Sequence, residues 1–290
     1  MSNAINTTPS RVVEPGAHPA HRRRRRQRRR PSPPYLPNGF ETFEQAKERR
    51  RHRRKVLRKG DRRARFVARV LRDCWPETRC SSEACPVCMR KFRKRFCRAA
   101  TKVIASSPEW TRASVIPSGL AVPLGKLNSV NVPNLVKALR KRIERSPYLR
   151  NRVVVGGLDV SLNVKENVVQ HWQLHLYLLI EAKRGRRLRA AVRTAFPPEP
   201  TAARPYRFRT VRDFAAASSY AYKSIFNRRS SYEKDGKPRT RNLPIKNDEL
   251  RELCTFLDSF PIGARLILRG VRRNGEKLQT VKTKQVSTEA

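Results

Sequence analysis

Residues 168–180 read VVQHWQLHLYLLI, and the alternation within this stretch decides the fold. Successive side chains of a β-strand point to opposite faces, so a period of two separates an apolar face from a polar one. We therefore predict a strand with the core on one side and two of the chain's five histidines on the other. The apolar set comprises Trp172, Leu174, Leu176, Leu178 and Ile180, and the polar set comprises His171, Gln173, His175 and Tyr177.

The preceding run, residues 153–163 (VVVGGLDVSLN), alternates in the same way and has Asp159 on its polar side. The two runs together predict a β-hairpin that turns near Glu166. Pairings that keep the apolar faces together place Asp159 opposite Gln173 or His175, roughly 5 Å away across the ladder. We expect an acid, an imidazole and a carboxamide or phenol to converge on one sheet face.

The composition indicates a polyanionic partner. Lys and Arg number 67 against 23 Asp and Glu, and a formal net charge of +44 on 290 residues opposes compaction and solubility without such a partner. Nucleic acid is the expected one, since no apolar run approaches the ~20 residues that span a bilayer. The N-terminus lacks the apolar core of a signal peptide. We therefore expect a cytoplasmic protein whose six cysteines are metal ligands or free thiols before they are disulfides.

Shifts in composition divide the chain into four segments. Residues 1–40 combine Pro, Ser and Asn with the run RRRRRQRRR, which predicts a disordered basic arm. Residues 41–73 predict one or two basic helices broken near Gly60. Residues 74–97 hold a cysteine cluster, and residues 110–285 are long enough for one compact domain.

The order of elements within residues 110–285 indicates the fold class. Helices would cover one face of the sheet and leave the polar face open, as in a split βαβ sandwich. We predict an α+β fold with an RRM-like antiparallel sheet that carries helices on one face, preceded by a small zinc knuckle and the basic arm. The expected elements are a strand at 111–116, the hairpin at 153–181, a closing strand pair at 265–282, and helices at 132–146, 186–195, 211–226 and 247–259.

The cysteine cluster occupies CWPETRCSSEACPVC, whose cysteines are Cys74, Cys80, Cys85 and Cys88. The closing Cys-x-x-Cys lets two thiolates of one knuckle hold a tetrahedral Zn²⁺ while two upstream thiolates complete its shell. A redox dithiol and unliganded thiols are the alternatives, and Cys97 could replace one ligand of the looser upstream half. We expect a structural zinc site here, and Cys254 in the core.

Basic residues flank the cluster on both sides, and we expect them to contact nucleic-acid phosphates. Because the arm cannot form a core, we expect it to attract phosphates without distinguishing one base sequence from another. After the cluster, RKFRKRF (90–96) interleaves cations with Phe92 and Phe96 on a predicted helix. The predicted contacts are Arg22, Arg23, Arg24, Arg25 and Arg26 in the arm, and Arg90, Lys91, Arg93, Lys94 and Arg95 after the cluster.

Residues 210–226, TVRDFAAASSYAYKSIF, predict a helix that begins with a capping-box-like Thr210 and Asp213. Tyr220 and Lys223 are spaced i and i+3 and would share one edge of that helix. A tyrosine held beside a lysine and a divalent metal can attack a phosphodiester, because cations lower the cost of the phenolate and neutralise charge on the phosphate. The alternative for a tyrosine of this helix is a structural role in the core or in ring stacking, which we expect for Tyr222.

Together these pieces resemble the rolling-circle replication initiators and relaxases of the histidine-hydrophobic-histidine (HUH) endonuclease superfamily, especially plasmid replication proteins with an N-terminal cysteine cluster. The matching segments are RASVIPSG (112–119), HWQLHLY (171–177) and YAYK (220–223). The resemblance implies an HUH-like palm domain and a DNA nickase. Tyr220 would be the nucleophile that forms a 5′-phosphotyrosine, Lys223 its electrostatic partner and His175 a metal ligand. It also implies single-stranded origin DNA and duplex DNA as partners, and it leaves a host helicase as a further partner to test.

One departure from the family affects the metal site. In the family the paired histidines flank a single hydrophobic residue, whereas here Gln173 and Tyr177 stand two residues to either side of His175. His171 lies four strand residues away, about 13 Å, too far to share one ion easily. We predict that His175, Gln173 and Asp159 hold Mg²⁺ or Mn²⁺, because hard divalent ions accept carboxamide and carboxylate oxygens.

A non-catalytic nucleic-acid-binding or regulatory protein with the same fold is the alternative. Its open sheet would stack bases on Trp172, Tyr177 or nearby aromatic residues. Strand parity argues against a role for Trp172, because it places that ring on the core face. The distance from the Tyr220 side chain to His175 and Asp159 distinguishes the nickase from the non-catalytic protein. A distance of more than ~12 Å, about two side-chain lengths, would exclude catalysis.

Overall fold

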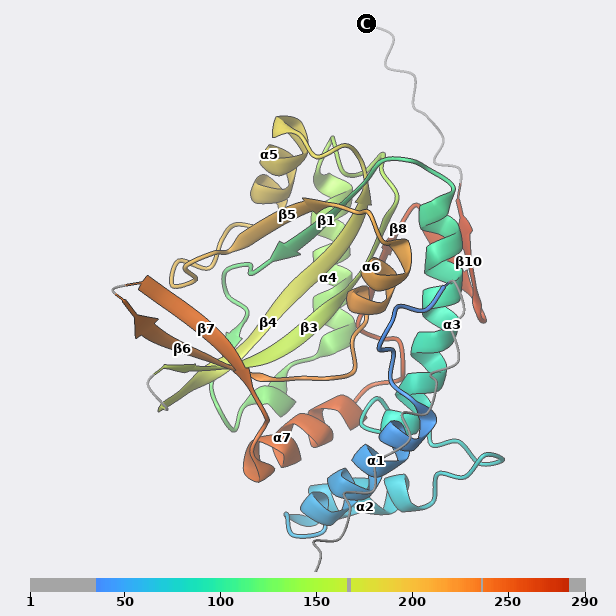
Figure 1. The fold of residues 1–290 in the computed structure, drawn as a ribbon, viewed down its shortest axis with the longest axis vertical. Helices are drawn as coiled ribbons and strands as arrows, with labels where there is room; N and C mark the ends of the chain where they lie inside the picture. Colours follow the sequence, from blue (N-terminus) through green and yellow to red (C-terminus); the bar gives the residue numbers. More distant parts are fainter. Residues whose placement is uncertain (1–34, 166–167, 236, 282–290) are drawn as a thin grey trace, which may run out of the picture. The chain divides into compact units, whose positions relative to one another are not determined.

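The computed structural model describes residues 35–165, 168–235 and 237–281 (Figure 1). The arm residues Arg22–Arg26 lie outside them. The described chain opens with α1 (Phe43–Leu57), α2 (Arg62–Arg72) and α3 (Pro86–Ala105). Asp61 begins α2 by accepting a hydrogen bond from the Ala64 backbone N–H at 2.7 Å. The predicted pair of basic helices broken near Gly60 is therefore confirmed.

One mixed sheet follows, and its strands run in the order β5-β1-β4-β3-β6-β7, with β2 paired to β4 and β8 paired to β3. The β3 and β6 strands are parallel, whereas the other pairings of this sheet are antiparallel. A separate hairpin of β9 and β10 packs on α3. The strands are β1 (Trp110–Val115), β2 (Ala121–Val122), β3 (Val154–Lys165), β4 (Val168–Glu181), β5 (Tyr206–Thr210), β6 (Arg228–Lys234), β7 (Lys237–Leu243), β8 (Leu266–Arg269), β9 (Val271–Asn274) and β10 (Lys277–Thr280).

The remaining helices lie between and after these strands. Most agree with the predicted ranges to within one residue, because each has a clear apolar stripe and a defined start such as the Asn131 cap of α4. No helix in the described ranges is both long and apolar enough to cross a membrane. They are the short 3₁₀ helix η1 (Leu127–Ser129), α4 (Val132–Arg145), α5 (Arg186–Ala195), α6 (Phe214–Ala221) and α7 (Asn247–Asp258).

The predicted hairpin forms the centre of the sheet. β3 and β4 pair antiparallel, with Asp159 opposite His175 and Ser161 opposite Gln173. This register selects one of the two pairings that the sequence allows. It keeps the apolar faces of both strands on the same side, as a one-residue slip would not.

The apolar face of the hairpin packs against α4, α5 and α7. Trp172 is fully buried there, and its Nε1 donates to Glu252 Oε2 on α7 at 2.8 Å. This confirms the parity argument and removes Trp172 as a base-stacking surface. Each large apolar side chain that is fully buried contributes about 1.5–3 kcal/mol, so this face stabilises the sheet.

The polar face is not open, and the expectation of helices on one face only is wrong. α6 and α3 pack against this second face, where Val155, Tyr177 and Leu179 join a buried cluster with residues of both helices. Figure 1 shows α4 behind β3 and β4 and α6 in front of them. The cause is visible in the sequence of β3 and β4, since Val155 and Leu179 interrupt the polar set and create an apolar patch that must be covered.

Two further differences concern segment boundaries. The helix predicted at 211–226 is shorter: it begins at Phe214 after the Asp213 cap and ends at Ala221, and residues 206–210 before it pair with β1 as strand β5. Residues 35–40, assigned to the arm, instead contact the domain: Leu36 is buried in the second cluster, with Tyr35 and Phe40 packed beside it. The α1, α2 and cysteine segments share their buried core with α7 and the sheet.

Candidate active site and cysteine cluster

Asp159, His175 and Lys223 converge on the polar face of the sheet. Asp159 Oδ2 on β3 lies 2.8 Å from His175 Nε2 on β4. The Lys223 ammonium, in the segment that follows α6, lies 2.5 Å from the same oxygen. Asp159 is 5% exposed and His175 6% exposed, so the cluster is buried. The proximity of Asp159 and His175 is as predicted, and Lys223 completes the group.

These contacts determine the charge of Asp159. Burial alone would raise the pKa of its carboxyl, but the charges of His175 and Lys223 and their hydrogen bonds outweigh burial and hold that pKa below its ordinary value. Asp159 is therefore an anion at neutral pH and has no proton to donate. Its carboxylate serves to fix the Lys223 ammonium at the end of α6.

Tyr220 stands at the edge of this cluster with its side chain accessible to a substrate. The residue is 51% exposed, and its ring packs on Tyr177 with centroids 4.6 Å apart. Lys223 Nζ lies 5.5 Å from the centre of the Tyr220 ring and 2.5 Å from Asp159. Tyr220 is thus inside the ~12 Å limit set for catalysis.

The cap of α6 and the position of Lys223 relative to this helix differ from the prediction. Asp213 alone caps α6, accepting from the Ala216 N–H at 2.8 Å, while Thr210 belongs to β5. Tyr220 lies in the last turn of α6, but Lys223 follows the helix in chain without regular secondary structure, so the two do not share a helix edge. The turn after Ala221 brings the ammonium to Asp159 instead.

Tyr222 is not available as a nucleophile. It is 1% exposed, and its hydroxyl donates to Glu83. Burial and the neighbouring Glu83 carboxylate raise the pKa of Tyr222 well above its ordinary value, so its phenolate is strongly disfavoured. The core role expected for Tyr222 is confirmed, and Tyr220 is the tyrosine of this pair that is exposed to solvent.

The three predicted metal ligands do not converge. Gln173 Oε1 lies 3.2 Å from His171 Nε2, and Gln173 Nε2 donates to the Leu174 carbonyl at 3.0 Å, so its carboxamide is engaged elsewhere. The Asp159 oxygen nearest His175 already contacts Lys223. The arrangement offers two adjacent ligands with an ammonium beside them and does not fit a resident divalent ion. We assign no reaction step to Mg²⁺ or Mn²⁺.

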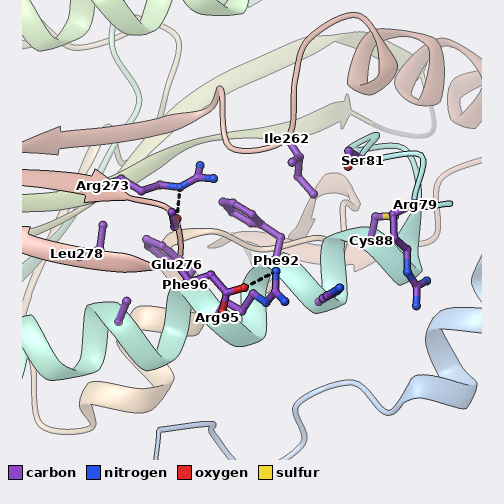
Figure 2. A pocket seen from close by; sticks show the side chains of 13 residues that line it. Arg79, Ser81, Cys88, Phe92, Arg95, Phe96, Ile262, Arg273, Glu276 and Leu278 are labelled. Atoms are coloured by element: carbon purple, nitrogen blue, oxygen red, sulfur yellow. Dashed lines mark hydrogen bonds and ion pairs between the residues drawn. The ribbon is translucent and has the colours of Figure 1, made fainter. Parts of the chain in front are cut away.

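The predicted phosphate contacts on α3 separate into exposed and internal residues. Lys91, Lys94 and Arg95 are exposed, and Arg95 pairs with Glu276 at 2.6 Å (Figure 2). Arg93 is buried and binds Glu41, the Tyr222 carbonyl and Ser219 Oγ at 2.7–2.9 Å. The assignment of Arg93 to nucleic acid is therefore wrong: the guanidinium holds α6 and the segment before α1 together. Arg90 is half-buried and donates to the Glu41 carbonyl.

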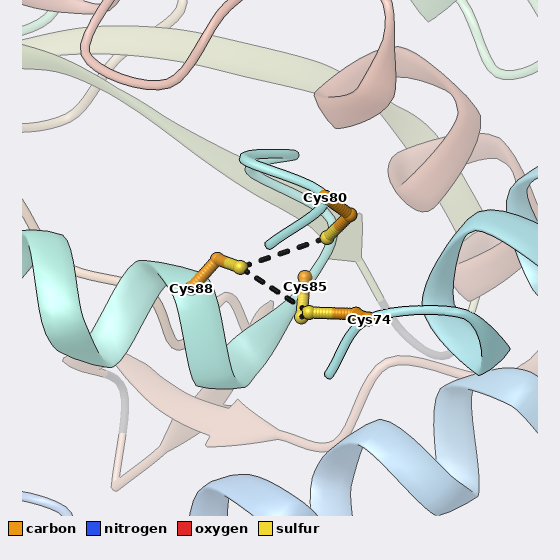
Figure 3. A group of neighbouring side chains, drawn as sticks. All are labelled: Cys74, Cys80, Cys85 and Cys88. Atoms are coloured by element: carbon orange, nitrogen blue, oxygen red, sulfur yellow. Dashed lines mark hydrogen bonds between the residues drawn. The ribbon is translucent and has the colours of Figure 1, made fainter. Parts of the chain in front are cut away.

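The four cysteine sulfurs lie within 4.8 Å of one another and could hold a metal ion (Figure 3). Sγ–Sγ distances are 3.5 Å for Cys74 and Cys88, 3.6 Å for Cys80 and Cys88, and 3.8 Å for Cys74 and Cys85. A regular tetrahedron with metal–sulfur bonds of about 2.3 Å has edges of about 3.8 Å, so the thiols are spaced as ligands. Cys97 is buried elsewhere in the core and takes no part in this group, and Cys254 is core as expected.

The start of α3 builds half of this site. Cys85 is the N-cap residue, Pro86 occupies the first turn and Cys88 follows three residues after Cys85, so both sulfurs project from one helix end. Hydrogen bonds from Cys80 and Cys85 lower the pKa of Cys88, while hydrogen bonding to Cys74 raises that of Cys85. These hydrogen bonds couple the four thiols to one another, as expected for side chains that share one small site.

A buried ion pair connects the cysteine loop to the candidate active site. Glu83, between Cys80 and Cys85, accepts from Arg265 Nε at 2.5 Å and from the Gly263 N–H at 3.0 Å, in addition to the Tyr222 hydroxyl. Arg265 Nη1 then donates to the Leu158 carbonyl at 2.7 Å, beside Asp159. The sequence does not predict this pair, because no local pattern relates residues 182 positions apart.

No known protein family model, curated protein sequence or solved structure matches this chain. The assignment of function therefore depends on the residues and geometry described above.

Proposed function

We propose that this protein binds single-stranded DNA and nicks it through Tyr220, acting as a replication initiator. The observation that carries the proposal is the convergence of an exposed tyrosine, the Lys223 ammonium and the Asp159–His175 pair. The net charge of +44 supports a nucleic-acid substrate, because a polyanion relieves the repulsion among these cations. The likeness of the three sequence motifs to the HUH superfamily supports the same reaction.

The proposed step is a displacement at phosphorus. The Tyr220 oxygen bonds to phosphorus while the bond from phosphorus to the 3′ oxygen breaks, which leaves a 5′-phosphotyrosine and a 3′-hydroxyl. The phenol loses one proton and the 3′ oxygen gains one, so the step is balanced. Lys223 favours the phenolate and the negative charge that develops on the phosphate, and Asp159 holds Lys223 in position.

We infer that the cysteine cluster holds structural Zn²⁺. Four thiolates complete a tetrahedral shell and leave no position for water or substrate, so this metal would stabilise the fold without taking part in cleavage. A catalytic Mg²⁺ or Mn²⁺ is implied by the resemblance alone, and a chelator tests it separately.

A covalent-adduct assay tests the proposed nicking. Protein is incubated with a 3′-labelled pool of single-stranded DNA of random sequence, with Mg²⁺, Mn²⁺ or chelator, and adducts are resolved under denaturing conditions. We expect an adduct from wild type and from Tyr232→Phe, which changes another exposed tyrosine, and none from Tyr220→Phe. An adduct that survives Tyr220→Phe would refute the nucleophile.

The lone histidine of the site favours one alternative, a protein that binds DNA without cutting it. Two adjacent ligands fit a catalytic ion poorly, which is consistent with loss of cleavage and retention of the fold. Strong binding of single-stranded DNA without any adduct, in each metal condition, would support this alternative over the nickase.

A further inference from the structure

A cavity of about 190 Å³ opens beside the cysteine cluster, between α3, the β9–β10 hairpin and the loop before β8. Figure 2 shows Phe92 and Phe96 of α3 facing Ile262 and Leu278 across it, with Arg273 above Phe92. Its volume is below the ~300 Å³ at which pockets for whole small-molecule ligands begin. The cavity therefore suits one ring-sized group and not a complete cofactor.

The rim of this cavity is basic. Its cations are Arg79, Lys91, Arg95 and Arg273, and its acid, Glu276, is paired with Arg95. Within the described residues Arg79, Lys91 and Arg273 have no acidic partner. The Nε of Arg79 is buried and lacks a hydrogen-bond partner there. Such a donor is costly to bury, and an anionic ligand would satisfy it.

Gly263 makes this arrangement of Arg273 and Phe92 possible. Its φ of +92° is strained for other residues, and a Cβ at this position would lie 2.5 Å from Arg273 Nη1 and 3.1 Å from the Phe92 ring. With glycine there, the guanidinium lies 5.0 Å from the centre of the Phe92 ring. An aromatic floor and a cation thus meet at one opening, as in sites that bind nucleobases by stacking.

We propose that this cavity binds one nucleobase of a DNA strand, with the adjoining phosphate on Arg79, Lys91 and Arg273. The proposal rests on the proposed function, since both need a DNA partner. A strand fits better than a free nucleotide because the charge continues beyond the cavity. Exposed Lys91, Lys94 and Arg98 follow one another along α3, and the first and last are seven positions apart, about 10 Å of helix; α3 contains no acid.

Two variants separate the base from the phosphate. Ala99 lines the cavity, so Ala99→Leu fills the space for the base without changing any charge. Arg273→Gln removes a rim cation from an exposed position on β9. Arg140→Gln makes the same charge change at an exposed position on α4, which does not line the cavity, and serves as the control.

Affinity for a single-stranded oligonucleotide is measured for each variant over a range of salt concentrations. We expect Ala99→Leu to bind about 5- to 150-fold more weakly with an unchanged salt slope, the effect of removing one stacked base. Arg273→Gln should reduce the slope by about 0.7, the value for one phosphate contact on a single strand. Arg140→Gln should leave the slope and affinity close to wild type.

The adduct assay with saturating DNA distinguishes failure of the cavity proposal from failure of the proposed nickase. If Tyr220 still forms its adduct while Ala99→Leu and Arg273→Gln bind DNA as wild type does, the cavity proposal is refuted and the nickase stands. If wild type binds a free mononucleotide as tightly as the oligonucleotide, the proposed strand occupant is wrong. If wild type binds no single-stranded DNA, the cavity proposal and the proposed function fail together.

Discussion

The Glu83–Arg265 pair should be the most sensitive point of the fold outside the hydrophobic core. Both side chains are at most 1% exposed, and the carboxylate of Glu83 accepts from Arg265, Tyr222 and Gly263. Glu83→Gln keeps the size of the side chain but leaves the Arg265 guanidinium buried without a counter-charge. Breaking a buried pair in this way costs about 3–5 kcal/mol, because the remaining charge cannot be hydrated.

This cost is large beside the total stability of a domain. Domains unfold with roughly 5–15 kcal/mol, so the variant should lose a large part of its stability. At about 2–4 °C per kcal/mol for a domain of this size, the Tm should fall by roughly 6–20 °C. Differential scanning calorimetry of the full chain measures this directly.

Glu276→Gln is the matched control, because it makes the same change in an Arg–Glu pair whose side chains are 45% and 58% exposed. An exposed pair contributes less than about 1 kcal/mol, so the Tm should change by no more than a few degrees. If Glu83→Gln and Glu276→Gln shift Tm equally, the buried pair is not stabilising the fold and the connection between the cysteine loop and the site is refuted.

The cysteine cluster, the Asp159 pair and the basic arm can each be tested separately. Cys88→Ser should release close to one equivalent of zinc, measured by mass spectrometry of the metal, and should weaken Tyr220 adduct formation because Glu83 is held between two ligands of the cluster; undiminished adduct formation would show that loop and site are independent. Asp159→Asn should cost about 3 kcal/mol at neutral pH by leaving Lys223 without its counter-charge. Because the folded pKa of Asp159 lies below the unfolded value of about 3.9, its stabilisation is complete above roughly pH 5 and is lost as pH falls, so urea titrations of wild type and Asp159→Asn should converge in acid and a constant difference would contradict the assignment. Deleting residues 1–34, which leaves Leu36 in the core, should flatten the salt dependence of duplex binding by up to ~0.9 units of slope for each phosphate that the arm neutralises, and an unchanged slope would show that the arm does not bind DNA.

Most of the correct predictions come from the alternation of apolar and polar residues along the strands. Period-two alternation over 153–163 and 168–180 specifies which residues face the core and limits the partner of Asp159 to Gln173 or His175, of which the structure has His175. The cysteine spacing likewise specifies the sulfur cluster, because its ligands are close in sequence. Local patterns of this kind need no knowledge of long-range packing.

The features that the sequence does not predict depend on contacts between segments that are far apart in the chain. A dense field of arginines looks uniformly like a nucleic-acid surface, yet Arg53 donates to the Ala84 carbonyl at 2.7 Å and Arg93 binds Glu41 in the interior. Their guanidinium groups are buried because fixed carbonyls and carboxylates satisfy them, which sequence periodicity does not reveal. The strands β6 and β7 were missed for a related reason, since their mostly polar residues give no apolar alternation.

The site of covalent attachment to DNA is the decisive observation for the proposed nickase. After reaction with single-stranded DNA and nuclease digestion, trypsin should release residues 213–223 as the peptide DFAAASSYAYK, which contains both candidate tyrosines. Fragmentation of this peptide should locate the phosphonucleotide on Tyr220, which is 51% exposed, and not on Tyr222, whose hydroxyl is held by Glu83. Attachment at Tyr222, or at a tyrosine in another peptide, would contradict the proposed site.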